Sequence, residues 1–344
     1  MYKVQNTKFR NDGLDIMKGI TILLMVYAHI SDAEIVNRFV FSFHMPLFFL
    51  LGGYFTKDNR LVKDFLPYTW KSTKRLLVPY FVTMLLICLW VWRFEIIKFR
   101  FNLTLQPVLN LIWGGGDVYT SHYGELYVGP IWFLFSIFVA RELFYIIQCL
   151  ASRCFARREG RNLLIILMTI TLSMLSILLY PSVQPLPWNI LPGIAALVFF
   201  MIGWGVRNIV VPIWIKIILV LCWLIVIILN IRIDLRSCEY GIIPLNILGA
   251  CGGTLVMYYL SKFLEFLSQK SLAFNWIVKF MIWCGTGSLA ILCMHTLDLM
   301  GGVSDYILGF FGGLSSVKFC LHLTIPLILT WIISKVGFLR KIYY

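Results

Sequence analysis

Charged residues are scarce in this sequence, since Asp, Glu, Lys and Arg together make up only 13% of its 344 residues. Ordinary soluble domains carry roughly 25% charged residues and about 45–50% apolar ones, whereas 60% of this chain is apolar. The apolar residues also come in runs long enough to cross a hydrocarbon layer, which takes roughly 20 residues per helix. The scarcity of charge therefore excludes an ordinary soluble domain and indicates an integral membrane protein.

Other patterns are missing as well. The apolar runs lack the alternation of apolar and polar residues that membrane-spanning strands need, which favours helices over a barrel. The nine cysteines contain no Cys-x-x-Cys pair, so we expect buried thiols and no disulfide framework. No internal repeat is visible, which argues against a transporter built from repeats. Residues 1–344 are therefore predicted to form a single transmembrane domain.

The apolar runs predict an all-α, polytopic fold with about ten transmembrane helices. The predicted spans are residues 13–30, 39–55, 76–92, 129–149, 163–180, 190–206, 211–230, 242–260, 280–299 and 317–336. With the N-terminus in the cytoplasm, roughly three-quarters of the Lys and Arg residues fall on the inner side, as the positive-inside rule requires. The net charge of +14 is therefore interpreted as a topology signal. We expect both termini to be cytoplasmic, a location in the cell (inner or plasma) membrane, contact with the lipid bilayer and no binding of nucleic acid.

Three histidines are predicted to lie at one depth in the membrane. His29 and His295 are near the outer ends of the first and ninth spans, and His44 is at the outer start of the second. Ionisable groups inside spans are costly and therefore candidates for a site, and histidine is the usual general base near neutral pH. Asp32 and Asp298 are positioned to fix the ring tautomers of His29 and His295. The alternatives are a coincidence of histidines at an interface and, with weaker support from the spacing, a metal site.

Lys18 is predicted to face the same direction as His29 on the first helix. Their separation of eleven residues corresponds to three helical turns within about 20° and to roughly 16 Å along the axis. One helix face then carries a cation in its inner half and an imidazole near its outer end, which suits an extended molecule threaded through the membrane. The alternatives are that Lys18 snorkels to the inner interface and that His29 only marks a helix end.

A basic cluster precedes the third span on the inner side. It consists of Lys71, Lys74 and Arg75. Such a cluster at a membrane surface is normally an orientation signal or a contact with anionic lipid. It is also what a ligand that carries a diphosphate needs, because Lys and Arg bind phosphate through charge-assisted hydrogen bonds.

The longest segment outside the predicted spans is 93–128, on the outer side. It contains Trp113, a run of three glycines at 114–116 and Glu125. Long loops of this kind are more often functional than simply connecting, and aromatic residues with polar neighbours suit a sugar surface. The alternative is an interfacial belt of aromatic residues with a flexible glycine hinge.

Several short motifs lie in order along almost the whole chain. They are Leu14-Asp15 to Lys18-Gly19 and His29, Phe43-His44-Met45-Pro46-Leu47-Phe48-Phe49, Gly52-Gly53-Tyr54, Lys71 to Pro79, Gly129-Pro130-Ile131-Trp132-Phe133-Leu134, and Gly287-Ser288-Leu289-Ala290-Ile291 to His295. In their order, spacing and placement at helix ends they resemble the acyltransferase 3 family of membrane O-acyltransferases, especially its fucose 4-O-acetylase-like branch. Lys18, Gly52 and Leu292 depart from the family's arginine, serine and tyrosine. Lysine keeps the positive charge but not the planar fork of arginine.

The resemblance implies acetyl-CoA as a cytoplasmic donor and a hydroxyl of an extracytoplasmic glycan or lipid-linked sugar as acceptor. Lys71, Lys74 and Arg75 would then hold the nucleotide and diphosphate, and the pantetheine arm would run along the Lys18 face. No metal is expected.

In this interpretation His29 is the general base that removes the proton from the sugar hydroxyl. His44 or His295 would stabilise the oxyanion or carry the acyl group covalently. Trp132, together with Trp113 and Glu125, would shape the acceptor side. The competing hypotheses are a polysaccharide exporter of the same family and, more distantly, a purely structural membrane scaffold.

Overall fold

The computed structural model describes residues 11–58, 60–93, 97, 106–116, 127–183, 186–207, 209–309 and 315–344. Across these ranges the regular secondary structure is helical, apart from one isolated bridge between Asp234 and Glu239. The nine cysteines are free. The α-helices are α1 (Asp12–Ile30), α2 (Glu34–Phe41), α3 (His44–Tyr54), α4 (Phe65–Val91), α6 (Gln106–Trp113), α7 (Phe133–Cys154), α8 (Arg158–Leu179), α9 (Ile190–Ala195), α10 (Leu197–Val206), α11 (Ile213–Ile228), α12 (Ile243–Ser268), α13 (Leu272–Thr286), α14 (Ser288–Gly301), α15 (Val303–Leu308), α16 (Ser315–Lys335) and α17 (Gly337–Tyr343).

The polytopic membrane fold predicted from the sequence is confirmed. Among the described residues, seven helices are long and apolar enough to cross a membrane, and there are up to nine spans if each of two bent helix pairs counts as one. The remaining predicted span, 211–230, corresponds to α11, which has only 16 residues. A perpendicular crossing of the hydrocarbon layer takes roughly 20 residues, so α11 is a shorter apolar helix.

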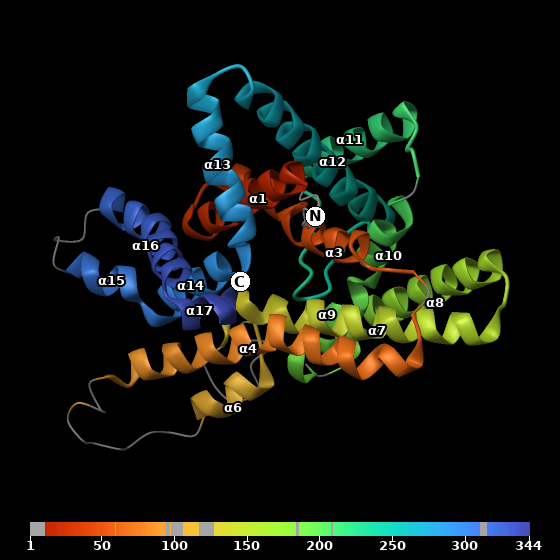
Figure 1. The fold of residues 1–344 in the computed structure, drawn as a ribbon, viewed down its shortest axis with the longest axis horizontal. Helices are drawn as coiled ribbons and strands as arrows, with labels where there is room; N and C mark the ends of the chain where they lie inside the picture. The colour runs from red at the N-terminus through yellow and green to blue at the C-terminus, as the bar shows by residue number, and fades with distance from the viewer. Residues whose placement is uncertain are drawn as a thin grey trace, which may run out of the picture.

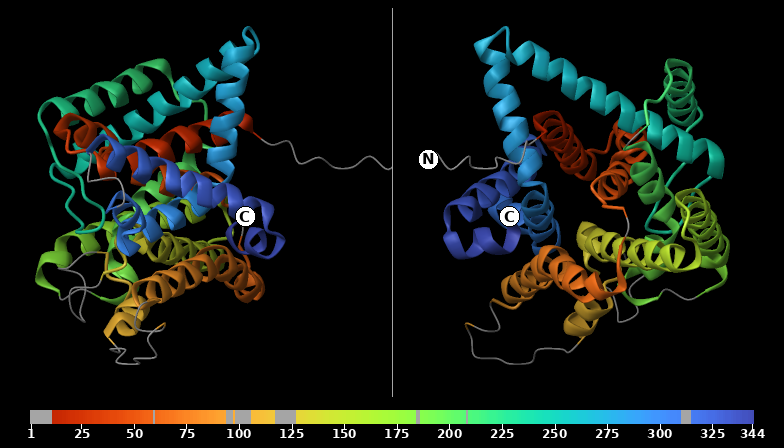
Figure 2. Two further views of the ribbon diagram at one scale, coloured as in Figure 1. Left: turned by 90° about the vertical axis from the view of Figure 1, so that its left-hand side faces the viewer. Right: turned by 45° about the vertical axis from the view of Figure 1, so that its right-hand side comes forward.

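Figure 1 shows α1 and α3 near the middle of the bundle and α4 beside α7 along one edge. α11, α12 and α13 lie on the opposite side, while α14, α15, α16 and α17 lie together beside α1 and α4. In Figure 2 the turn between α12 and α13 projects beyond the rest of the bundle. The first helix is therefore packed between the α12–α13 pair and the C-terminal helices.

The contact between α1 and α13 depends on glycine at two facing positions. A side-chain carbon added to Gly19 would overlap the carbonyl oxygen of Met281, and one added to Gly285 would overlap the carbonyl oxygen of Asp15. Small residues let two backbones approach this closely, which is the usual basis of helix packing in a bilayer. Glycine at these two positions therefore fixes where α1 lies.

The predicted span 280–299 is broken. α13 and α14 form one of the two bent pairs, with an angle of 75° between them. Gly287 separates them with φ −91° and ψ 11°, and its N–H closes the last turn of α13 on the carbonyl of Trp283 at 3.0 Å. Because of this break, α14 turns into the bundle and carries the fully buried His295 with it.

Two other predicted spans are also interrupted. The span 190–206 is bent by 49° between α9 and α10. The span 39–55 is divided into α2 and α3 at Phe43, whose φ of −142° and ψ of −22° are not helical. This second interruption places His44 at the first position of α3.

Glycine also brings α10 against α3, and this contact can be tested. A side-chain carbon on Gly203 would overlap the carbonyl oxygen of Leu50, so we expect Gly203→Val to lower the free energy of unfolding by at least roughly 1–3 kcal/mol. Gly205→Val is the matched control, because that position in the same helix has nothing within 4 Å. Thermal unfolding of the purified protein in detergent compares the two variants, and equal midpoints would contradict the close contact.

Candidate active site

The three histidines singled out in the sequence lie together at one end of the bundle. The ring centroids of His29 and His295 are 5.6 Å apart. The ring of Phe41 links His29 to His44, because its centroid lies 5.5 Å from that of His29 and 5.2 Å from that of His44. His29 is exposed, whereas His44 and His295 are 5% and 0% exposed. The cluster is thus built by α1, α3 and α14, and it is accessible from outside the protein at His29.

The orientation of the His44 ring is fixed by the preceding helix. Its Nδ1 atom lies 3.0 Å from the backbone carbonyl oxygen of Val40. A carbonyl oxygen can only accept a hydrogen bond, so Nδ1 carries the proton of the neutral ring and Nε2 is the acceptor nitrogen. His44 therefore has a nitrogen that can accept a hydrogen bond from a hydroxyl group.

The predicted pairing of Asp298 with His295 is wrong. Both ring nitrogens of His295 are buried without a hydrogen-bond partner in the described part of the chain. Asp298 instead accepts a hydrogen bond from Nδ1 of His322 in α16, at 2.7 Å. Although His295 and Asp298 are one turn apart on α14, His295 faces α1 and Asp298 faces α16.

Both oxygens of the Asp298 carboxylate accept hydrogen bonds. Its second oxygen accepts hydrogen bonds from the backbone N–H and the hydroxyl of Ser304, at 2.8 and 2.7 Å. The other predicted orienting carboxylate, Asp32, is exposed beyond the end of α1, and the ring of His29 contacts His295 and Phe41.

His322 is a fourth histidine of this region that sequence reasoning missed. It is 3% exposed and lies within electrostatic range of His295. Its Nε2 atom is 3.8 Å from Asp305, which pairs with Lys318 at 3.1 Å. The signal was present, because an ionisable side chain inside the predicted span 317–336 is itself a candidate for a site.

Arg236 is a second missed residue at this end. It lies in the segment between α11 and α12 and within electrostatic range of His29. Asp234 holds it in place by accepting from the Arg236 backbone N–H at 2.9 Å and from its guanidinium at 3.2 Å. The hydroxyl of Tyr180 donates to the Arg236 carbonyl at 3.3 Å. A guanidinium in a braced position therefore adds positive charge beside the histidines.

Of the predicted acceptor residues, Trp132 is placed beside this region. A side-chain carbon on Gly116 would lie 2.8 Å from the Trp132 ring and 3.1 Å from the Arg236 side chain. Trp132 is 7% exposed, and Trp113 is half-buried at the end of α6. Glu125 lies outside the described residues.

The glycine run 114–116 is packed and hydrogen-bonded. All three glycines are buried. The Asn189 side chain donates to the Gly114 carbonyl at 2.5 Å, and the Val128 N–H donates to the Gly115 carbonyl at 2.9 Å. Gly114 has a φ of +81°, which glycine adopts without steric cost. The burial and hydrogen bonds of this run argue against the alternative of a flexible glycine hinge.

The predicted basic cluster lies in the first half of α4. Lys71, Lys74 and Arg75 are all exposed. The ammonium of Lys74 lies 4.9 Å from the ring centroid of Trp70, and Arg75 lies within electrostatic range of Arg141 in α7. Arg141 was not predicted, and it extends the cationic surface from α4 onto α7.

Two tyrosines with mutually tilted rings lie beside arginines at this end. The rings of Tyr68 and Tyr145 are 4.6 Å apart. The Arg60 guanidinium lies 4.8 Å from the Tyr68 centroid and 5.1 Å from the Tyr145 centroid, and the Arg141 guanidinium lies 5.4 Å from Tyr68. These cation–π contacts hold arginines near one another at this end.

Lys18 has a partner on its own helix. Its ammonium lies 2.6 Å from the carboxylate of Asp15, and its side chain is 24% exposed. α1 runs unbroken from Asp12 to Ile30, so the predicted axial separation of Lys18 and His29 follows from the helix. The Lys18 charge is balanced within α1, which the sequence reasoning did not anticipate.

The comparison with known families identifies the chain. A family model described as an acyltransferase domain, acyltransferase 3, matches residues 11–338. The chain belongs to the acyltransferase 3 family. Family membership was the expectation from the motifs, and the apolar helices make the chain a multi-pass membrane protein. The match does not separate the branches of the family, so the fucose 4-O-acetylase-like branch stays a prediction.

Among curated proteins, the chain is similar to nodulation protein NolL of Mesorhizobium japonicum. The two are 24% identical over 231 residues, a match that covers 58% of this chain and 58% of that protein. The chain thus spans little more than half the length of this relative. No solved structure matches the chain.

Two histidine replacements should affect stability differently. His322→Leu should lower the free energy of unfolding by roughly 3–5 kcal/mol, because it removes a partner from the buried carboxylate of Asp298. His295→Leu should leave the free energy of unfolding unchanged or raise it, because the His295 ring has no hydrogen bond to lose. Thermal unfolding in detergent measures both variants. Equal losses would contradict the difference in hydrogen bonding between the two rings.

Proposed function

We propose that this acyltransferase moves an acetyl group from cytoplasmic acetyl-CoA to a hydroxyl of an extracytoplasmic cell-surface glycan or lipid-linked sugar, in the inner or plasma membrane of the cell. The observation that carries the proposal is the cluster of His29, His44 and His295 at one end of the bundle. Acyl transfer to a hydroxyl needs a base beside the acceptor, and this cluster supplies accessible imidazole in a chain of an acyltransferase family.

His29 is the general base in this proposal. It is the exposed member of the cluster, so an incoming hydroxyl meets it first. His29 takes the hydroxyl proton while the sugar oxygen forms a bond to the thioester carbonyl carbon. The carbon–sulfur bond then breaks, and the thiolate leaves and is protonated as CoA. A positioned base of this kind contributes about 10²–10⁴-fold to the rate.

The remaining polar groups of the cluster have supporting roles. The Arg236 guanidinium, within electrostatic range of His29, stabilises the negative charge that develops on the carbonyl oxygen. The Nε2 atom of His44 accepts a hydrogen bond and orients the acceptor. The alternative route, in which His44 or His295 carries the acetyl group covalently, uses the same atoms in two steps.

The donor enters from the opposite end in this proposal. Lys71, Lys74, Arg75 and the neighbouring Arg141 hold the diphosphate through charge-assisted hydrogen bonds. The neutral pantetheine arm extends along α1 past Lys18. On the acceptor side, Trp132, Trp113 and Glu125 contact the sugar, with aromatic rings packing on its C–H face.

Replacing His29 tests the proposal. We expect His29→Gln to lower O-acetyl transfer by about 10²–10⁴-fold, because glutamine keeps a polar side chain but cannot take the proton. Mass spectrometry of the surface glycans of cells that carry the wild-type or the variant chain measures the acetylation. CoA binding to the purified variant should be unchanged, since His29 lies away from the cationic end.

The same measurement separates acetylation from export. An exporter that has lost a working residue would lower the amount of surface glycan and leave the acetyl content of each chain unaltered. Unchanged acetylation with His29→Gln would remove His29 from the reaction.

The direction of transfer depends on topology, which reporter fusions test. We expect a reporter fused at position 155, between α7 and α8, to be cytoplasmic and a reporter fused at position 115 to be external, because the basic residues gather on the inner side. The opposite result would reverse the sides assigned to donor and acceptor.

A further inference from the structure

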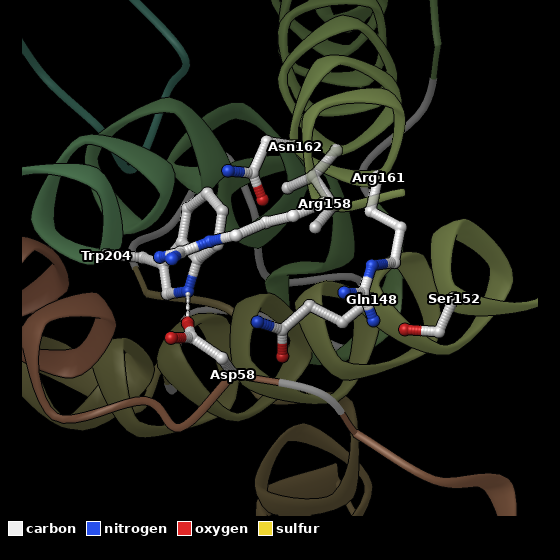
Figure 3. A pocket seen from close by; sticks show the side chains of 8 residues that line it. Asp58, Gln148, Ser152, Arg158, Arg161, Asn162 and Trp204 are labelled. Carbon is white, nitrogen blue, oxygen red and sulfur yellow. Dashed lines mark hydrogen bonds between the residues drawn. The ribbon is translucent and has the colours of Figure 1, made fainter. Parts of the chain in front are cut away.

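A second polar site lies far from the histidines. It is a cavity of about 180 Å³ between the end of α7, the start of α8, α10 and the segment that follows α3 (Figure 3). Gln148 lies 16 residues beyond Trp132 along α7, which places the cavity roughly 24 Å from the acceptor end. The cavity is on the same side as the cationic cluster of α4.

The cavity has an excess of positive charge. Arg158 and Arg161 of α8 line it. Asp58 contributes a carboxylate, but this carboxylate already binds Arg207 at 2.7 Å and accepts from the Trp204 indole N–H at 2.6 Å. The lining of the cavity therefore carries two guanidinium groups and one carboxylate, a composition that suits an anion.

The start of α8 adds backbone donors. Arg158 is the first residue of α8, and no side chain caps the helix at Arg157. The first N–H groups of a helix have no partner within the helix, and together with the helix dipole they favour an anion at this end.

Gln148 places a hydrogen-bond acceptor at the same cavity. The residue is 2% exposed, and its amide nitrogen donates to the Lys57 carbonyl at 3.3 Å. Its amide oxygen is buried without a partner in the described part of the chain, and Figure 3 shows the amide beside the two arginines of the cavity. A buried acceptor of this kind is costly unless a donor reaches it.

We propose that this cavity binds a phosphate monoester that lies next to a free hydroxyl, as on the phosphorylated ribose of CoA. Arg158 and Arg161 hold the phosphate at the start of α8, and the ribose hydroxyl donates to the Gln148 oxygen. The inference rests on the proposed function, which supplies acetyl-CoA as the donor. Gln148 lies seven residues beyond Arg141 on α7, about 10 Å along the axis, so the diphosphate and the ribose phosphate would lie along one helix.

Binding of CoA and of dephospho-CoA, which lacks the ribose phosphate, tests the proposal by titration calorimetry on the purified full chain. We expect the wild type to prefer CoA by about 10- to 100-fold, the range for charged hydrogen bonds. The double variant Arg158→Gln, Arg161→Gln should lose this preference and keep the wild-type affinity for dephospho-CoA, which also shows that it is folded. Arg157→Gln is the matched control, because Arg157 is exposed and does not line the cavity.

The possible results separate the two proposals. Equal binding of CoA and dephospho-CoA by the wild type, or a preference that survives in the double variant, overturns the cavity assignment alone. Failure of the wild type to bind either coenzyme overturns the acetyl-CoA donor and this inference together.

A lipid headgroup is the other source of a phosphate monoester. Phosphatidylcholine vesicles with and without phosphatidic acid test it. If the wild type binds phosphatidic acid and the double variant does not, while the double variant still prefers CoA over dephospho-CoA, the cavity binds a lipid headgroup. That result would overturn the assignment of the cavity to the coenzyme.

Discussion

The close approach of α1 and α13 determines where the reactive groups lie. Gly19 and Gly285 each face a backbone carbonyl of the other helix, so neither helix can shift without a clash. In a bilayer the lipid tails are as apolar as the side chains, and helices are held by such close packing. His29 is the last residue but one of α1, and α13 ends at the break at Gly287 that turns α14 into the bundle. The 5.6 Å separation of the His29 and His295 rings therefore follows from a contact made near the other end of α1.

Some polar groups inside the bundle have hydrogen-bond partners within the protein, and others have none among the described residues. Asp298 is satisfied by His322 and Ser304, as expected where an unpaired buried group is costly. His295 and Gln148 instead keep buried atoms without a partner among the described residues. Each lies beside an accessible polar site, at opposite ends of the molecule. An unsatisfied group that the fold retains in such a place suits a ligand that completes its hydrogen bonds.

Depth in the membrane was predictable from the sequence, and direction around the helix axis was not. Hydropathy and the distribution of basic residues place His29, His44 and His295 at one level, and the structure brings them together. The partner of Asp298 depends on which neighbouring helix it faces, and no pattern along one chain reports the position of α16. The break at Gly287 was missed for a related reason, because an apolar run predicts one span whether or not the helix is broken within it.

The missed arginines show the same limit. Arg60 and Arg158 lie in inner segments between predicted spans, where a positive charge already has an explanation as a topology signal. Arg236 lies in a short outer segment, where the sequence alone gives it no neighbour in a site. Only three-dimensional neighbours distinguish an arginine braced by Asp234, or one that lines a cavity, from one that is simply exposed.

The length of α7 sets a physical requirement on any donor that uses both ends of the bundle. Trp132 stands at its start and Gln148 near its end, roughly 24 Å apart along the axis. Moving a phosphate across that distance through an apolar interior would leave its charge without water or partners, which is prohibitively costly. A donor whose charged groups stay at the cationic end and whose reactive carbonyl is carried on a long neutral arm avoids this cost. In the proposed reaction the acetyl group therefore reaches the histidines while every phosphate remains on the side from which the donor entered.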